Sequence, residues 1–154
     1  MTSVLFICHG NICRSTMAEF VMKDILRKRG LDGAVCVESA ATSREELGND
    51  TYYETKRVLD AHGVPHTPRH ARQTTRADYG EFDYIVGMDA ENMAGMRRIY
   101  GGDPEGKLSL LLDWTGVAGD VADPWYTRNF DATFDDVEAG CIALAGHLAR
   151  SERA

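Results

Sequence analysis

The sequence predicts an α/β fold, in which an open sheet of four parallel strands carries helices on both faces. Short apolar runs alternate with longer segments of helical periodicity along the 154 residues, and such alternation is typical of strands joined by helical crossovers into a parallel sheet. The first apolar run, residues 4–7, is continuous, as in a strand buried on both faces. The length suits one domain, residues 1–154, around one core.

A tight loop and a helix are predicted after this first strand. From Ser15 onward, apolar residues recur at helical spacing, and Thr16 and Glu19 have the spacing of a capping box at a helix start. Gly30 favours the end of this helix, because glycine readily adopts the left-handed conformation found there.

The same alternation continues to the end of the chain. Strands are predicted at residues 34–38, 82–88 and 108–112. Helices are predicted at residues 50–62, 90–100 and 134–150. Gly63 is expected to end the first of these helices, and Asp89 and Thr133 are expected to cap the other two. The intervening residues 39–50, 63–81 and 113–133 are predicted to be loops, which often carry functional residues.

The composition narrows the class of protein. Hydrophobic residues make up 44% and charged residues 27% of the chain, which is typical of a soluble globular protein. The formal net charge of −7 argues against a nucleic-acid-binding protein, which needs a basic face. We expect a cytoplasmic protein without membrane insertion, because no signal-peptide pattern and no membrane-spanning apolar stretch is found. The cysteines at positions 8, 13, 36 and 141 are therefore expected to be reduced.

The segment from Cys8 to Ser15 combines features of a phosphate site. It lies between the first strand and the first helix, where ligands bind in open α/β sheets. Backbone N–H groups and the partial positive charge of a helix N-terminus favour an anion there. Arg14 can hold two phosphate oxygens in a bidentate fork. The same surroundings favour the thiolate form of a cysteine, which is the nucleophilic form.

The spacing alone leaves other interpretations open. A cysteine is often a small buried hydrophobic residue, and a bare Cys-x5-Arg pattern arises easily by chance. A metal site would need a second pair of ligands beside Cys8 and Cys13, and the sequence offers none at suitable spacing. No metal and no cofactor are therefore expected.

Several motifs, in order along the chain, resemble the low-molecular-weight protein tyrosine phosphatases. The first is Val-Leu-Phe-Ile-Cys-His-Gly-Asn-Ile-Cys-Arg-Ser-Thr-Met-Ala-Glu at residues 4–19. The others are Ser-Ala-Ala-Thr at 39–42, Ala-Arg-Gln at 71–73, Phe-Asp-Tyr-Ile at 82–85, Met-Asp at 88–89 and Asp-Pro-Trp-Tyr at 123–126. The resemblance implies hydrolysis of protein phosphotyrosine through a phosphocysteine. Cys8 is then the nucleophile, Arg14 the phosphate clamp and Asp123 the general acid.

The resemblance also implies supporting roles. Ser15 is expected to donate a hydrogen bond to the Cys8 thiolate, and Asn11 to hold the loop in an unusual backbone shape, because asparagine tolerates the left-handed region. Ser39 is expected to support Asn11. The other residues of the phosphate-binding loop are His9, Gly10, Ile12 and Cys13. The expected walls of the substrate pocket are Glu45, Trp125 and Tyr126. The resemblance further implies that oxidation can join Cys13 to Cys8.

Some residues depart from the pattern of the family. His9 stands where a small or apolar residue is usual, and Thr16 replaces a proline at the helix start. Glu45 stands where relatives often carry an aromatic or bulky apolar residue, so it is expected to repel acidic residues that flank the phosphotyrosine. The buried histidine of the family is shifted, and either His66 or His70 is a candidate for its place.

Three competing functions remain. Arsenate reductases of this fold relay a disulfide through further cysteines, but Cys36 and Cys141 lie outside the expected region. Protein-arginine phosphatases tend to carry threonine at the position of Ile12. A non-catalytic module that binds phosphotyrosine would need neither the cysteine nor the acid. The expected partners are a tyrosine-phosphorylated protein, in bacterial relatives often an autophosphorylating tyrosine kinase, and inorganic phosphate or another oxyanion in the site.

Overall fold

The sheet has four strands, all parallel, in the order β2-β1-β3-β4. The computed structural model describes the backbone of residues 1–153 and the side chains of residues 1–152. The strands are β1 (Thr2–Cys8), β2 (Val35–Ala41), β3 (Tyr84–Gly87) and β4 (Leu108–Leu110). The α-helices are α1 (Arg14–Lys28), α2 (Tyr53–Ala61), α3 (Arg76–Glu81), α4 (Ala90–Tyr100), α5 (Pro124–Thr127) and α6 (Phe130–Arg153). The predicted fold class is confirmed.

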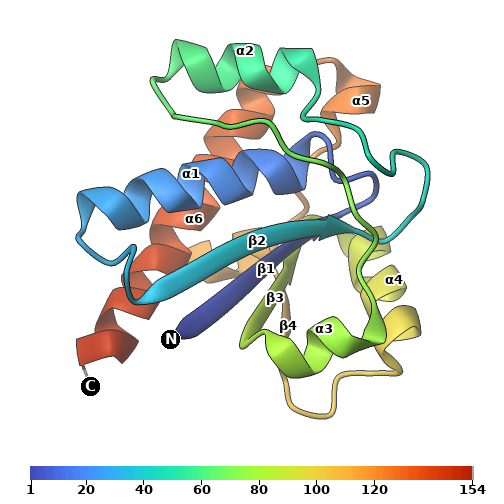
Figure 1. Cartoon of the computed structure of the whole chain (residues 1–154), viewed down its shortest axis with the longest axis vertical. Coiled ribbons are helices and arrows are strands. Elements are labelled where there is room, and N and C mark those ends of the chain that lie inside the picture. Colours follow the sequence, from blue (N-terminus) through green and yellow to red (C-terminus); the bar gives the residue numbers. More distant parts are fainter. Residues whose placement is uncertain (154) are drawn as a thin grey trace.

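Helices cover both faces of the sheet (Figure 1). Val4, Phe6 and Cys8 of β1 belong to the core that lies against α1 and α6. Leu5 and Ile7 belong to a second core, which α3 and α4 cover. Because successive side chains of a strand point to opposite faces, the continuous apolar run of β1 serves both cores at once.

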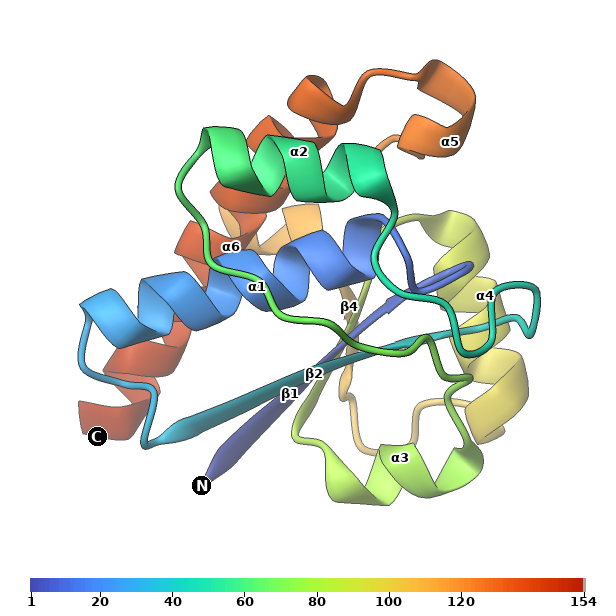
Figure 2. The same ribbon diagram turned by 45° about the horizontal axis from the view of Figure 1, so that its top comes forward.

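The strand order places the loop after β1 at a switch point of the sheet. The chain passes from β1 to β2 on one side and later returns to β3 on the other side of β1. The crossovers therefore diverge at the carboxyl end of β1, where ligands bind in folds of this type. In Figure 2 the loops after β1 and β2 meet at this end of the sheet, below α2 and α5.

The predicted capping box at the start of α1 is wrong. The helix begins at Arg14, so Thr16 already lies inside its first turn. The hydroxyl of Thr16 donates to the carbonyl oxygen of Cys13, at 3.0 Å. The carboxylate of Glu19 accepts from Ser39 at 2.5 Å and from Lys23 at 2.6 Å. The helix starts earlier than predicted, because Arg14 and Ser15, the last residues of the predicted loop, already belong to its first turn.

The predicted cap of the last helix is also wrong. Helix α6 begins at Phe130, and Asn129 accepts a hydrogen bond from the backbone N–H of Ala132 at 3.0 Å. The hydroxyl of Thr133 donates to Asn129 and to Ala122. The short helices α3 and α5 lie in segments predicted to be loops. Strand β2 extends to Ala41, past the predicted end at residue 38.

Several helix boundaries agree with the sequence. Gly30 follows the end of α1 with a φ of 69°, as predicted. Asp89 precedes α4 and accepts a hydrogen bond from the N–H of Asn92 at 2.8 Å. Gly63 follows α2 with a φ of 68°, the left-handed conformation that favours glycine. None of the helices in the described part of the chain combines the length and the apolar character needed to cross a membrane.

Candidate active site

The loop between β1 and α1 wraps around the thiol of Cys8. Asn11 has a φ of 61°, the left-handed conformation expected for it, and its backbone N–H points to the Cys8 sulfur at 3.3 Å. The Ser15 hydroxyl lies 2.9 Å from the same sulfur. Cys8 itself is buried at the base of the loop. A thiolate at this position therefore has two donors close to it.

The side chain of Asn11 links this loop to its surroundings. Its amide nitrogen donates to Ser15 and to Ser39, both at 2.9 Å. Its amide oxygen accepts from the guanidinium of Arg69 and from the backbone N–H of Arg72. An arginine has only donors, so the amide oxygen must face Arg69 and the amide nitrogen must face the serines.

Arg69, and not His66 or His70, is the residue of this segment that hydrogen-bonds Asn11. One of its guanidinium nitrogens also donates to the carbonyl oxygen of Asn11 at 2.6 Å. His66 instead pairs with Asp60 at 2.8 Å, and His70 lies 2.9 Å from the carbonyl oxygen of Gly48. Neither histidine hydrogen-bonds Asn11, and sequence reasoning missed Arg69. In the sequence, Arg69 is marked by its position two residues before the Ala-Arg-Gln motif.

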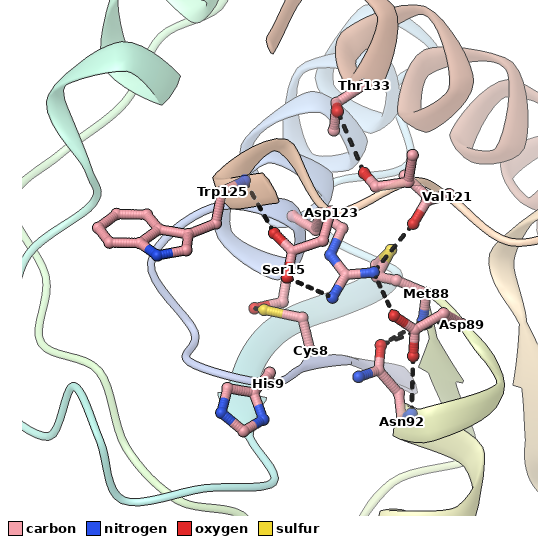
Figure 3. Close-up of polar contacts among 12 residues, drawn as sticks. Cys8, His9, Ser15, Met88, Asp89, Asn92, Val121, Asp123, Trp125 and Thr133 are labelled. Atoms are coloured by element: carbon pink, nitrogen blue, oxygen red, sulfur yellow. Dashed lines mark hydrogen bonds and ion pairs between the residues drawn. The ribbon is translucent and has the colours of Figure 1, made fainter. Parts of the chain in front are cut away.

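The guanidinium of Arg14 is almost fully buried and is held from two sides. It donates to Asp89 at 2.6 Å and to the carbonyl oxygen of Val121 at 2.9 Å, and it lies 3.4 Å from Asp123 (Figure 3). Burial disfavours its charge, but the neighbouring Cys8 and Asp89 outweigh burial and raise the pKa of Arg14. The group therefore stays charged and oriented.

Asp89 was predicted only as a helix cap. One carboxylate oxygen of Asp89 caps α4 through the N–H of Asn92, and the other holds Arg14. Because β3 pairs with β1 in the sheet, Asp89, the second residue after β3, is placed next to the loop after β1. The Met-Asp motif was the available signal, but its partner lies 75 residues away in the sequence.

Asp123 caps α5 and faces the same space as Cys8 (Figure 3). One of its carboxylate oxygens accepts from the N–H of Trp125 at 3.0 Å, and the other is directed toward Arg14. Pro124 follows at the first position of the helix, where proline is favoured. The side chain of Asp123 is 25% exposed, so it is accessible from the pocket.

The pocket above Cys8 has a volume of about 240 Å³ and brings the predicted wall residues together. Trp125 and Tyr126 form one side and are 47% and 83% exposed. His9 and Glu45 also line the pocket and are paired at 2.9 Å. Glu46, which the sequence analysis did not single out, also lines the pocket.

Cys13 lies beside this pocket as a neutral thiol. Burial, together with the nearby Cys8, raises the pKa of Cys13 to about 12. Both cysteines are free in the structure. Among the residues that the structure describes, no cluster of three or more His, Cys, Asp or Glu side chains has the geometry of a metal site.

Comparison with known proteins identifies the family. The family model described as low molecular weight phosphotyrosine protein phosphatase matches residues 3–154. The chain belongs to this family. The low molecular weight protein-tyrosine-phosphatase YfkJ of Bacillus subtilis is 36% identical over 155 residues, which cover 99% of this chain and 99% of that protein. The predicted family is thus confirmed.

Solved structures of the family share the architecture of this chain. The crystal structure of YfkJ covers 98% of this chain and 96% of its own chain, with a TM-score of 0.94 and 37% identity. A low molecular weight protein tyrosine phosphatase from Streptococcus pyogenes covers 96% of this chain and 93% of its own, with a TM-score of 0.87 and 36% identity. The Drosophila arginine phosphatase DARP covers 96% and 98%, respectively, with a TM-score of 0.86 and 27% identity.

Proposed function

We propose that this member of the family hydrolyses protein phosphotyrosine to tyrosine and phosphate through a phosphocysteine at Cys8. The observation that carries the proposal is the convergence of Cys8, Arg14 and Asp123 on one pocket. A nucleophile, a phosphate clamp and a carboxylic acid are the groups that a two-step phosphate transfer needs.

In the first step, the loop amides and the guanidinium of Arg14 hold the phosphoryl oxygens of the substrate. The Cys8 thiolate attacks phosphorus, an S–P bond forms and the bond from phosphorus to the phenolic oxygen breaks. Asp123, in its protonated form, gives its proton to that oxygen, so tyrosine leaves as a neutral phenol. The fork of Arg14 stabilises the charge that spreads over the phosphoryl oxygens in the transition state.

In the second step, the Asp123 carboxylate takes a proton from a water molecule that attacks the phosphocysteine. The S–P bond breaks, inorganic phosphate forms and Cys8 leaves as a thiolate. The Ser15 hydroxyl, 2.9 Å from the sulfur, stabilises this leaving group. It is free to donate because its oxygen already accepts from Asn11. The Ser39 hydroxyl accepts the other hydrogen bond of the Asn11 amide nitrogen.

The pocket favours an aromatic ester. Trp125 and Tyr126 offer ring faces for the phenyl group of phosphotyrosine, and Ile12 adds an apolar contact on the floor of the pocket. Phosphoarginine is a second candidate substrate, because Glu45 and Glu46 lie at the pocket and carboxylates accept hydrogen bonds from a guanidinium. The likeness to DARP, an arginine phosphatase, also supports phosphoarginine. The rings of Trp125 and Tyr126, in contrast, favour phosphotyrosine.

The wider setting is part of the same proposal. We propose a cytoplasmic enzyme that acts on a tyrosine-phosphorylated protein, such as an autophosphorylating bacterial tyrosine kinase, and that holds inorganic phosphate or another oxyanion in the same cradle. The proposal extends to oxidation, in which the Cys13 thiol condenses with a sulfenic acid on Cys8, a water molecule leaves and a disulfide forms; both cysteines line the same pocket.

Hydrolysis of p-nitrophenyl phosphate by the wild type, Cys8→Ser and Asp123→Ala, with chelator and reductant present, tests the proposal. We expect turnover by the wild type, none by Cys8→Ser and a loss of roughly 10²–10⁴-fold for Asp123→Ala. Phosphotyrosine and phosphoarginine peptides then decide the substrate. Activity that survives Cys8→Ser contradicts the thiolate mechanism, and tight vanadate binding without turnover indicates a binding module.

A further inference from the structure

The loop that carries Asp123 ends in a residue with an unusual backbone. Arg128 directly follows α5 and has a φ of 58°, in the left-handed region that side chains other than glycine and asparagine rarely adopt. Its backbone N–H donates to the carbonyl oxygen of Pro124 at 2.9 Å. A strained conformation of this kind persists only where the surroundings hold it in place.

Three aromatic rings surround the side chain of Arg128. Its guanidinium carbon lies 5.9 Å from the ring centre of Tyr52, 5.8 Å from that of Trp125 and 5.5 Å from that of Phe130. These distances are within the range of about 6 Å for an attraction between a cation and an aromatic face. The guanidinium also donates to the hydroxyl of Tyr52 at 3.3 Å.

Tyr52 connects this cluster to the phosphate-binding loop. Its backbone N–H donates to the carbonyl oxygen of Ile12 at 2.9 Å. Its ring packs edge-on against Trp125, with 5.1 Å between the ring centres, and is stacked on Phe130 at 5.7 Å. Tyr52 thus touches both the loop of the nucleophile and the loop of the acid. Figures 1 and 2 show α5 beside the N-terminal end of α2, which Tyr52 precedes.

We propose that Arg128 and Tyr52 are positioning residues that set the distance between Asp123 and the substrate oxygen above Cys8. This inference rests on the proposed function, in which Asp123 is the general acid. A proton donor must lie within about 2.6–3.2 Å of the oxygen that it protonates. A displacement of about 1 Å costs up to roughly 100-fold in rate. Neither Arg128 nor Tyr52 takes part in the chemistry itself.

The leaving group of the substrate provides a readout that a merely structural role does not move. Phenolate is a strong base and depends heavily on the proton of Asp123 in order to leave, whereas p-nitrophenolate is a weaker base and depends on that proton less. A misplaced acid therefore slows phenyl phosphate much more than p-nitrophenyl phosphate. General loss of folded protein slows both esters equally.

Arg128→Gly and Tyr52→Phe are the variants to test. Glycine adopts a positive φ without strain, so Arg128→Gly removes the side chain and leaves the backbone unstrained. We expect kcat/KM, which reports the step in which the leaving group departs, to fall by about 10-fold or more for phenyl phosphate and several-fold less for p-nitrophenyl phosphate. Tyr52→Phe removes only a hydroxyl and should cause the same pattern to a smaller extent.

Lys107→Ala is a matched control. Lys107 directly precedes β4, at the amino end of the parallel strands, whereas the site lies at their carboxyl end. Its ammonium lies 5.2 Å from the ring centre of Tyr79. Its loss should leave both rates unchanged. Equal losses on the two esters, or none, in both test variants would overturn the inference. A wild type that hydrolyses neither ester would refute the proposed function and, with it, this inference.

Discussion

Replacement of Arg69 by methionine removes the cation that orients the phosphate-binding loop. Arg69→Met keeps much of the side-chain volume but deletes two hydrogen bonds from a charged donor to the oxygens of Asn11. Hydrogen bonds to charged groups contribute about 1.5–3 kcal/mol each. Arg69 is half-buried and water can partly replace it, so we expect the free energy of unfolding to fall by about 2 kcal/mol in total.

The same change should reduce activity through Ser15. Without Arg69, the Asn11 amide is free to turn, and the Ser15 hydroxyl is then not reserved for the Cys8 sulfur. The loss of one such hydrogen bond, about 1.4 kcal/mol, corresponds to about a tenfold lower kcat/KM. Urea unfolding and turnover of p-nitrophenyl phosphate measure the two effects. Arg57→Met, which breaks an exposed pair with Glu54, is the control and should change neither.

Arg69→Lys separates charge from geometry. Lysine keeps the positive charge but lacks the planar guanidinium that reaches both oxygens of Asn11. The stability and activity of Arg69→Lys should therefore lie between those of the wild type and of Arg69→Met. If Arg69→Met is as stable and as active as the wild type, the Asn11 amide is held by Ser15 and Ser39 alone. The orienting role assigned to Arg69 is then wrong.

Three further predictions concern Asp89, Cys13 and Glu45. Asp89→Asn keeps a residue suited to cap α4 but removes the charge that anchors Arg14, so kcat/KM should fall about tenfold, and the urea midpoint should fall because the buried guanidinium loses a compensating charge. The folded protein holds the proton of Cys13 more tightly than the unfolded chain, because its pKa is raised from 9.0 to about 12. Titration of Cys13 should therefore leave the free energy of unfolding independent of pH below 9.0 and make it fall as the pH rises towards 12. In Cys13→Ala, which lacks the thiol, this fall should be less steep. Glu45→Gln should raise kcat/KM for acid-flanked relative to base-flanked phosphopeptides by about 3-fold at low salt, and high salt should abolish the difference.

The fold was predictable because each strand and its following helix carry local signals. The apolar run of β1 and the glycine after α2 need only their own neighbourhood in the sequence to be interpreted. The starts of α1 and α6 were misplaced for the opposite reason. Thr16 and Thr133 have the chemistry of caps, but their hydroxyls are used by Cys13 and Ala122, and which carbonyl lies nearby depends on the tertiary structure.

The residues of the site likewise divide into those with local signals in the sequence and those whose contacts depend on the tertiary structure. Cys8 and Arg14 lie in one loop, so their spacing alone indicated a shared anion, and a motif pointed to Asp123. Arg69 and Asp89 act on that loop from 58 and 75 residues away. Each makes its contact through an ordinary hydrogen bond that many surface residues also make. No local pattern distinguishes such a residue, because its partner is chosen by the pairing of strands and the path of loops. The supporting residues of a phosphate site are therefore harder to predict than its reacting ones.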